Sequence, residues 1–292
     1  FISLLCLAAQ RKGMVINMKK ILASLIAFIL FISLLSGCAA NKTTLQKKEA
    51  ESTGLEKFQA TANMQILQST RETLGSDGKT EQIILYSEQS PNGMPQSWSL
   101  VVDDIEKIKL SPEEGLYGFA EVKFEDVDGD DIKEVLFYRQ STGSAGARGL
   151  TIYKTGGKDW QQLFSVNDPF DFDDMEGKRY EVKYLGDYYV RFEDRQTGLK
   201  TTIALDAEEY QGLEDMLKEI STWVDPIAEY SLVDYDGNGV KEIITIQRVI
   251  GIAHADTLAF LKTTYKLEQG RYKAVTLSLT DVNDKPLAEV KL

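Results

Sequence analysis

The chain has 292 residues, of which 43% are apolar and 27% charged, which is the composition of an ordinary globular protein with one or two domains. Its formal net charge is −12, and leaving out residues 1–37 removes Arg11, Lys12, Lys19 and Lys20 and no acid, which gives −12 − 4 = −16. So acidic a protein repels nucleic acid and anionic lipid headgroups. The charge therefore excludes the functions that need a basic surface on this protein.

The N-terminal region is typical of an export signal. Lys19 and Lys20 precede an uncharged apolar run of fifteen residues from Ile21 to Leu35. The run ends in Leu35-Ser36-Gly37-Cys38, which resembles the lipobox of bacterial lipoproteins. That resemblance implies that Cys38 is acylated and becomes the first residue of the mature chain. The alternative is a signal anchor that stays as a transmembrane helix, although the run is shorter than the ~20 residues that span a bilayer.

Three segments follow from this interpretation. Residues 1–37 are expected to comprise upstream residues, since 1–17 do not begin with Met, and then the signal peptide. Residues 38–54 are expected to be the lipidated cysteine and a polar tether, and residues 55–292 a β domain built from repeats. Cys38 is the one cysteine left after residue 37, so no internal disulfide is available.

The start of the expected domain carries two weaker patterns. Residues 55–74 show some helical spacing of apolar residues. Next, Asp77, Gly78 and Glu81 precede an apolar strand and look like a worn copy of two acidic loops further along the chain. The worn copy lacks acids at its first two positions, so we expect its shape without a metal.

The first acidic loop is Asp126–Glu134, and the second, Asp234–Glu242, repeats it. Oxygen-bearing side chains stand at positions 1, 3, 5 and 9 of both loops: Asp126, Asp128, Asp130 and Glu134, then Asp234, Asp236, Asn238 and Glu242. This spacing suits a hard cation such as Ca²⁺, which takes about six to eight oxygen ligands. The alternative is an acidic β-turn that binds nothing, because Asp, Asn and Gly favour turns for backbone reasons.

The two loops differ in the residue at position 6. This position holds Asp131 in the first loop, where Asp tolerates left-handed backbone better than most residues, and Gly239 in the second. Neither loop is a helical EF-hand, because strand patterns flank both and position 12 holds Phe137 or Thr245 in place of a bidentate acid. With more carboxylates, the first loop is expected to depend more strongly on calcium.

The repeated loop resembles the calcium loops of FG-GAP and VCBS-type repeats, although the Gly-Ala-Pro element of that family is missing. The resemblance implies cation binding at the eight positions above and integrin-like β-propeller blades. Glu81, Glu134 and Glu242 are 53 and 108 residues apart, so a period near 54 is expected, which is the size of a four-stranded blade. We therefore predict an all-β, propeller-like array of about four antiparallel units with one main helix.

The remaining elements fit this prediction. A hairpin is expected over residues 180–192 with a Gly186-Asp187 turn, and a strand over 199–205. Asp206 is expected to cap a helix whose apolar stripe is Tyr210, Leu213, Met216, Leu217 and Ile220. Further strands are predicted over residues 230–233, 242–250, 258–265, 272–279 and 287–292.

Catalytic patterns are weak. His254 is the single histidine, and Gly143–Gly149 matches neither a serine elbow nor a phosphate loop, so a hairpin tip is preferred. The acidic stretch 168–174 could hold a third ion or two catalytic carboxylates, but a solvated loop is preferred.

We therefore expect an exported protein, anchored to the bacterial cell membrane through Cys38, that is a non-catalytic binding or scaffold module braced by structural Ca²⁺. Its partner would be an unidentified protein or glycan, not nucleic acid. Two alternatives stay open: an extracytoplasmic hydrolase using the Asp171 to Glu176 carboxylates, and a solute-binding lipoprotein. The second alternative needs two α/β lobes, whereas this chain offers one clear helix among many strands.

Overall fold

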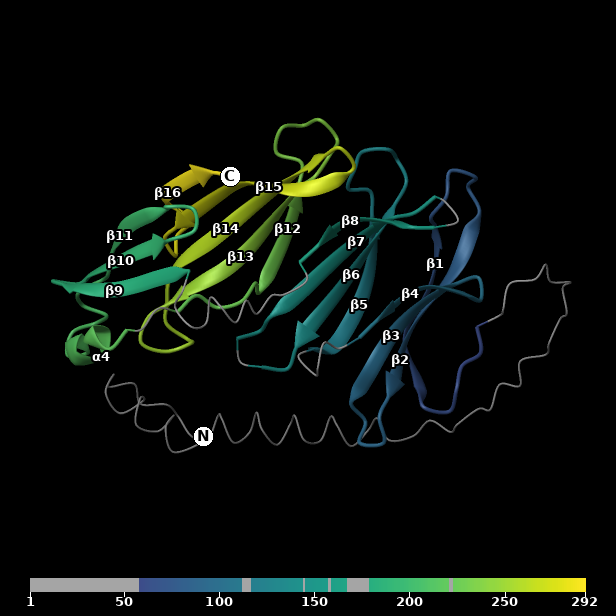
Figure 1. The fold of residues 1–292 in the computed structure, drawn as a ribbon, viewed down its shortest axis with the longest axis horizontal. Coiled ribbons are helices and arrows are strands. Elements are labelled where there is room, and N and C mark those ends of the chain that lie inside the picture. Colours follow the sequence, from purple (N-terminus) through teal and green to yellow (C-terminus); the bar gives the residue numbers. More distant parts are fainter. Residues whose placement is uncertain (1–57, 112–116, 144, 157–158, 167–178, 221–222) are drawn as a thin grey trace, which may run out of the picture. The chain divides into compact units, whose positions relative to one another are not determined.

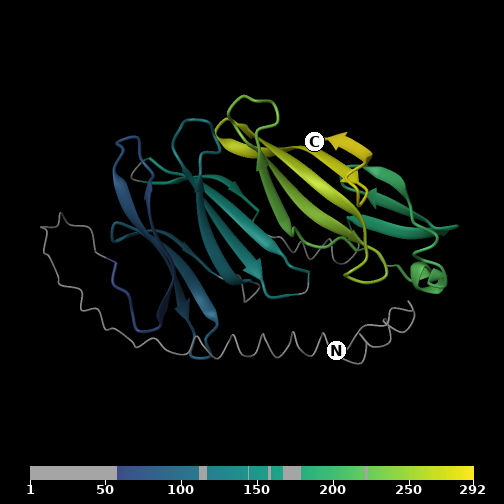
Figure 2. The ribbon, with the colours of Figure 1, turned by 180° about the vertical axis from the view of Figure 1, so that it is seen from behind.

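The computed structural model describes residues 58–111, 117–143, 145–156, 159–166, 179–220 and 223–292, all within one compact unit that spans Gly54–Leu292. These residues form sixteen strands in four antiparallel sheets and one short helix (Figure 1). Figure 2 shows the same sheets from behind. Within each sheet, strands that follow one another in sequence are neighbours, so every sheet is an antiparallel meander.

The first two sheets have four strands each. The first sheet consists of β1 (Met64–Thr73), β2 (Thr80–Gln89), β3 (Pro95–Val102) and β4 (Ile105–Leu110). The second sheet consists of β5 (Tyr117–Glu125), β6 (Glu134–Ser141), β7 (Arg148–Lys154) and β8 (Gln161–Ser165).

The other two sheets complete the domain. The third sheet consists of β9 (Tyr180–Gly186), β10 (Tyr189–Asp194) and β11 (Lys200–Ala204), and α4 (Glu214–Lys218) follows it in the chain. The fourth sheet consists of β12 (Glu229–Val233), β13 (Glu242–Ile250), β14 (Thr257–Glu268), β15 (Arg271–Thr280) and β16 (Pro286–Lys291). The two acidic loops therefore connect the first two strands of the second and the fourth sheet.

The second sheet is covered on both faces. In β6, Val135 and Phe137 belong to a buried cluster shared with the first sheet, whereas Leu136 and Tyr138 belong to one shared with the fourth sheet. Successive side chains of a strand point to opposite faces, so an unbroken apolar run is what such a strand requires. The fourth sheet in turn shares a third buried cluster with the third sheet and α4, which contributes Leu217.

The all-β prediction with four antiparallel units is confirmed, but the described sheets do not form a closed propeller. The three buried clusters each join two sheets, and together they link the sheets in the order first, second, fourth and third. Among the described residues, no such cluster joins the first sheet to the third, which closure of a ring would require. The sheets also pack in an order that differs from their order in the chain, whereas consecutive propeller blades pack in chain order.

Most of the predicted strands are confirmed. The strands expected after residue 229 are β12 to β16. β6 and β7 pair as the antiparallel hairpin that was expected around Gly143–Gly149, and the last two residues of that segment begin β7. The hairpin over 180–192 is also present, but its turn lies one residue later than predicted. Gly186 ends β9, and Asp187 and Tyr188 form the turn with φ of 50° and 60°. That pair of left-handed residues is the geometry of a type I′ hairpin turn.

The helix predicted after Asp206 is wrong in length and in its cap. The observed α4 covers Glu214–Lys218 and has no side-chain cap. Asp206 instead accepts a hydrogen bond from the backbone N–H of Glu208 (2.9 Å), and Gly212 has a left-handed φ of 81°. Such local hydrogen bonds compete with a helix, and the left-handed glycine interrupts it.

The helical spacing in residues 55–74 was misleading as well, because β1 occupies Met64–Thr73 and pairs with β2 over most of its length. Strand pairing overrides a weak local preference. The worn loop copy lies where expected, between β1 and β2. In the described ranges, no helix is both long and apolar enough to cross a bilayer.

Candidate functional site

The first acidic loop is folded by its own side chains. The Asp126 carboxylate accepts hydrogen bonds from the backbone N–H groups of Gly129 (2.8 Å) and Asp131 (2.9 Å), and Asp130 accepts one from Ile132 (2.9 Å). Gly129 and Asp131 have left-handed φ values of 78° and 65°. The prediction that Asp131 takes the left-handed position is confirmed, and the short acidic side chains shape this turn through local hydrogen bonds.

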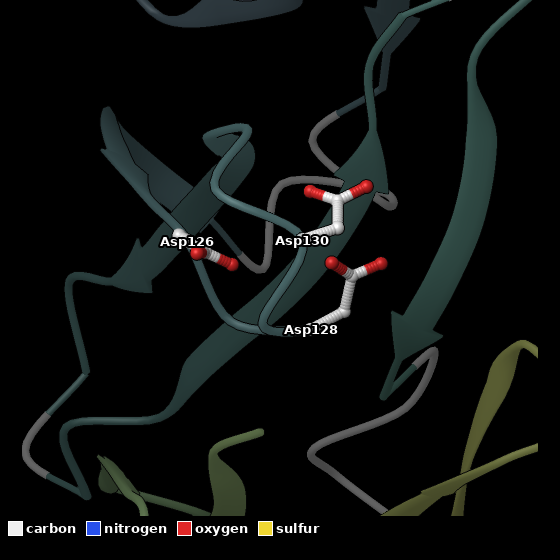
Figure 3. A group of neighbouring side chains, drawn as sticks. All are labelled: Asp126, Asp128 and Asp130. Carbon is white, nitrogen blue, oxygen red and sulfur yellow. The ribbon is translucent and has the colours of Figure 1, made fainter. Parts of the chain in front are cut away.

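Three of the four predicted ligands in this loop lie together. One carboxylate oxygen from each of Asp126, Asp128 and Asp130 lies within 4.8 Å of the others (Figure 3). The ammonium of Lys154 contacts Asp128 and lies 2.7 Å from Asp130 Oδ2. The Asp128 side chain is only 7% exposed, and its Oδ1 has no hydrogen-bond partner among the described residues. This oxygen is available to a cation.

Glu134, the fourth predicted ligand, begins β6 and is fully buried at 0% exposure. Its Oε2 accepts a hydrogen bond from the Val127 N–H (2.9 Å), whereas its Oε1 has no partner in the described part of the chain. Burial raises the pKa of Glu134 to about 7, and the charges of Asp128 and Asp130 add to that shift. A carboxylate in this position needs a positive charge to be stable in its ionised form.

The second acidic loop has the same backbone. The Asp234 carboxylate accepts hydrogen bonds from Gly237 (2.8 Å) and Gly239 (2.9 Å), the positions that Gly129 and Asp131 occupy in the first loop. Glu242 Oε2 accepts one from the Tyr235 N–H (3.0 Å), as Glu134 does from Val127. The predicted repeat is thus a repeat of structure as well as of sequence.

The electrostatics of the two loops differ. The Lys266 ammonium lies 2.8 Å from Glu242 Oε1 and 3.3 Å from Asp236 Oδ2. Burial acts to raise the pKa of Glu242, but the hydrogen bonds from Lys266 and the Tyr235 N–H outweigh it and hold that pKa below its usual range. The pKa values of the equivalent glutamates, Glu134 and Glu242, are therefore shifted in opposite directions. Among the described residues, the three acids that lie close enough together to hold a metal ion are in the first loop.

The two loops lie against each other, which the sequence did not predict. The Lys241 N–H donates to the Val127 carbonyl (2.9 Å), and the Tyr272 hydroxyl lies 3.0 Å from the Val127 carbonyl oxygen and 2.9 Å from that of Lys241. A Cβ on Gly129 would lie 2.9 Å from the Gly239 carbonyl oxygen, so glycine permits this approach. The loops therefore connect the second and fourth sheets directly.

A second charged cluster surrounds Asp225, which is fully buried at 0% exposure. Arg248 Nη2 lies 2.5 Å from Asp225 Oδ2, and His254 Nδ1 lies 3.2 Å from Asp225 Oδ1. The Trp223 ring packs edge-on against the His254 ring, with centroids 4.2 Å apart. Sequence reasoning singled out His254 but missed Asp225, because nothing near Asp225 in the sequence marks it as buried.

Several predicted features fall on residues that the structure does not describe. These are the export signal and Cys38, the acidic stretch 168–174, and the Asp171 to Glu176 carboxylates of the hydrolase alternative. They remain predictions.

Comparison with known proteins gives two matches. A family model described as the YybI C-terminal domain matches residues 178–280, which include the second acidic loop and not the first. The uncharacterized protein YybI of Bacillus subtilis (strain 168) is 26% identical in an alignment of 234 residues that covers 73% of this chain and 84% of the relative. No solved structure matches the chain.

These matches correct the resemblance to FG-GAP and VCBS-type repeats, which is wrong. The family model that matches is that of the YybI C-terminal domain, and the described sheets form no closed propeller. The acidic turn misled the interpretation because the hydrogen bonds that shape its backbone are local, so that any strand–turn–strand unit can carry it. The carboxylate geometry described above does not depend on that resemblance.

Proposed function

We propose that this chain is an exported, lipid-anchored surface protein, a non-catalytic binding or scaffold module whose fold is braced by Ca²⁺ at the first acidic loop. The observation that supports the bracing role is the contact of the two loops between the second and fourth sheets. Clustered carboxylates at such a junction repel one another unless a cation neutralises them. The acidic body favours a partner that is basic or bridged by divalent cations.

The residues of the first loop fit a calcium ion. Asp126, Asp128 and Asp130 bring oxygens to one place, and Glu134 has a buried oxygen with no hydrogen-bond partner in the described structure. A backbone carbonyl near position 7 would add another oxygen. An all-oxygen donor set with several carboxylates is the kind that Ca²⁺ prefers, and extracellular calcium modules bind with Kd of ~10⁻⁴ to 10⁻³ M.

Removal of calcium is expected to lower the melting temperature by several degrees. A ligand bound only by the folded state stabilises it by mass action, and ~1 kcal/mol shifts a domain of this size by about 2–4 °C. Thermal unfolding would be measured in a chelator and again after millimolar calcium is restored. Magnesium should restore the melting temperature poorly, because it demands a smaller octahedral site.

Asp128→Asn provides the matched control, since it removes one buried carboxylate and keeps the size of the side chain. This variant should melt at nearly the same temperature with and without calcium. A wild-type melting curve that the chelator leaves unchanged would contradict the bracing role.

Lipidation at Cys38 is tested separately. Cys38→Ser is expected to move the protein from the membrane fraction to the soluble or unprocessed pool, because ~0.8 kcal/mol per buried acyl CH₂ group would be lost. Fractionation and mass spectrometry of the mature N-terminus would measure this. Unchanged membrane partition with the N-terminal peptide intact would support the signal-anchor alternative instead.

A further inference from the structure

The structural repeat includes a lysine that the sequence comparison of the two loops did not reveal. Val135 pairs with Tyr153 across β6 and β7, and Ile243 pairs with Tyr265 across β13 and β14. One residue beyond each pair, the glutamate at position 9 of the loop faces a lysine on the neighbouring strand. These lysines are Lys154 in the first copy and Lys266 in the second. Both direct their ammonium groups at the carboxylates of the loop.

The two lysines contact different ligand positions. Lys154 bridges positions 3 and 5, Asp128 and Asp130, and leaves Glu134 Oε1 without a partner among the described residues. Lys266 bridges positions 3 and 9, Asp236 and Glu242. In the second loop the buried glutamate, which is 4% exposed, therefore already has a positive charge beside it.

The net charge of the two loops also makes the first loop the better cation site. The first loop holds five carboxylates (Asp126, Asp128, Asp130, Asp131 and Glu134) against the ammonium of Lys154, which leaves −5 + 1 = −4, because its own Lys133 pairs with Glu72 outside the loop. The second loop holds three (Asp234, Asp236 and Glu242) against the ammonium of Lys266, which leaves −3 + 1 = −2, because its own Lys241 pairs with Glu125 outside the loop. At position 5 the second loop has Asn238, whose Oδ1 is already used by the Val240 N–H at 2.7 Å.

We propose that Lys266 replaces the divalent cation in the second acidic loop, so that the chain binds one calcium ion, at the first loop, where the ion displaces Lys154. This inference rests on the proposed role of calcium in bracing the fold. It goes beyond that role by assigning a function to each lysine and by making the two loops unequal. Removal of Lys266 should open a second site, since a hollow of about 90 Å³ lined by Asn238, Glu242 and Lys266 lies there.

The test is a titration of the purified protein with calcium chloride, by calorimetry, for the wild type, Lys266→Met and Lys154→Met. The wild type should bind one ion, and Asp128→Asn should abolish that binding. Lys266→Met should bind two ions, and Lys154→Met should bind one ion more tightly than the wild type. Lys262→Met is the matched control, because Lys262 is on the same strand and pairs with Asp284 at 2.6 Å, away from the loop.

Thermal unfolding in chelator gives an independent measurement. Lys266→Met should melt several degrees below the wild type and recover with calcium, whereas Lys262→Met should melt close to the wild type. Two ions in the wild type, or one in Lys266→Met, would overturn the inference and leave the bracing role intact. If no variant binds calcium, the bracing role fails. In that case, equal melting temperatures of Lys266→Met and Lys262→Met would overturn the inference too. A melting temperature that falls only in Lys266→Met would support Lys266 as the cation that neutralises the second loop.

Discussion

Arg248→Met is expected to destabilise the protein by about 3 to 5 kcal/mol, the cost of removing the guanidinium partner of a buried carboxylate. Asp225 is 0% exposed, and Arg248 lies 2.5 Å from its Oδ2. Burial raises the pKa of Asp225, and the positive charge of Arg248 opposes that rise. Methionine keeps most of the side-chain volume and removes the charge. Denaturant unfolding at constant pH would measure the loss as a shift of the midpoint with an unchanged slope.

Arg191→Met is the matched control for this experiment. Arg191 pairs with Glu181 at 3.0 Å in the third sheet, but the two side chains are 31% and 23% exposed. Water screens such a pair, so a cost of about 1 kcal/mol or less is expected. Adding Asp225→Asn to Arg248→Met should recover part of the stability, because no buried charge is then left without its partner. Similar costs for Arg248→Met and Arg191→Met would contradict a buried ion pair at Asp225.

The second large effect is a pH dependence of the calcium-free protein that originates at Glu134. Its pKa is about 7 in the folded chain, against 4.5 for an ordinary glutamate, so between these values the folded state holds a proton that the unfolded state has released. The stability that the folded protein gains from the raised pKa of Glu134 is fully present below pH 4.5 and is lost as the pH rises through 7. A tenfold change in proton affinity is worth about 1.4 kcal/mol, so this loss is roughly 3 kcal/mol.

Glu134→Gln isolates this effect, because glutamine can still accept the Val127 hydrogen bond and cannot ionise. In chelator, the stability of the wild type relative to this variant should fall as pH rises from 4.5 to 7, by the amount given above. Saturating calcium should flatten that slope, since a divalent ion beside the carboxylate favours its charged form. A relative stability that stays constant over this range would show that Glu134 keeps an ordinary pKa.

Local patterns in the sequence were sufficient for the parts of this protein whose structure depends on near neighbours. The acidic loops fold by hydrogen bonds between residues at most seven apart, such as Gly129 to Asp126 and Val127 to Glu134. Their residue types and spacing therefore predicted the turn, including the left-handed Asp131. The strands that flank them were predicted for the same reason, because alternation and β-branched residues are local signals.

Prediction from local pattern failed where a distant contact decides the structure. The stripe from Tyr210 to Ile220 has helical spacing, but Tyr210 is held by a hydrogen bond from its hydroxyl to Asp256, and only Glu214–Lys218 is helical. The resemblance to propeller repeats failed similarly, because nine-residue turns carry no information on how sheets are ordered. Burial and packing between sheets outweigh the few tenths of a kcal/mol per residue that local preference supplies.

Residue pattern alone was enough to predict that the chain is all-β, that it carries two copies of an acidic turn, and which side chains those turns present. The contact of the two turns through Lys241 and Val127, residues 114 positions apart (241 − 127), became visible in the folded chain. The fold also places Lys154 and Lys266 against the carboxylates and buries Asp225 beside Arg248. Strand pairing and sheet packing bring these groups together over long sequence separations, and the charge of a loop depends on neighbours that its own sequence does not contain.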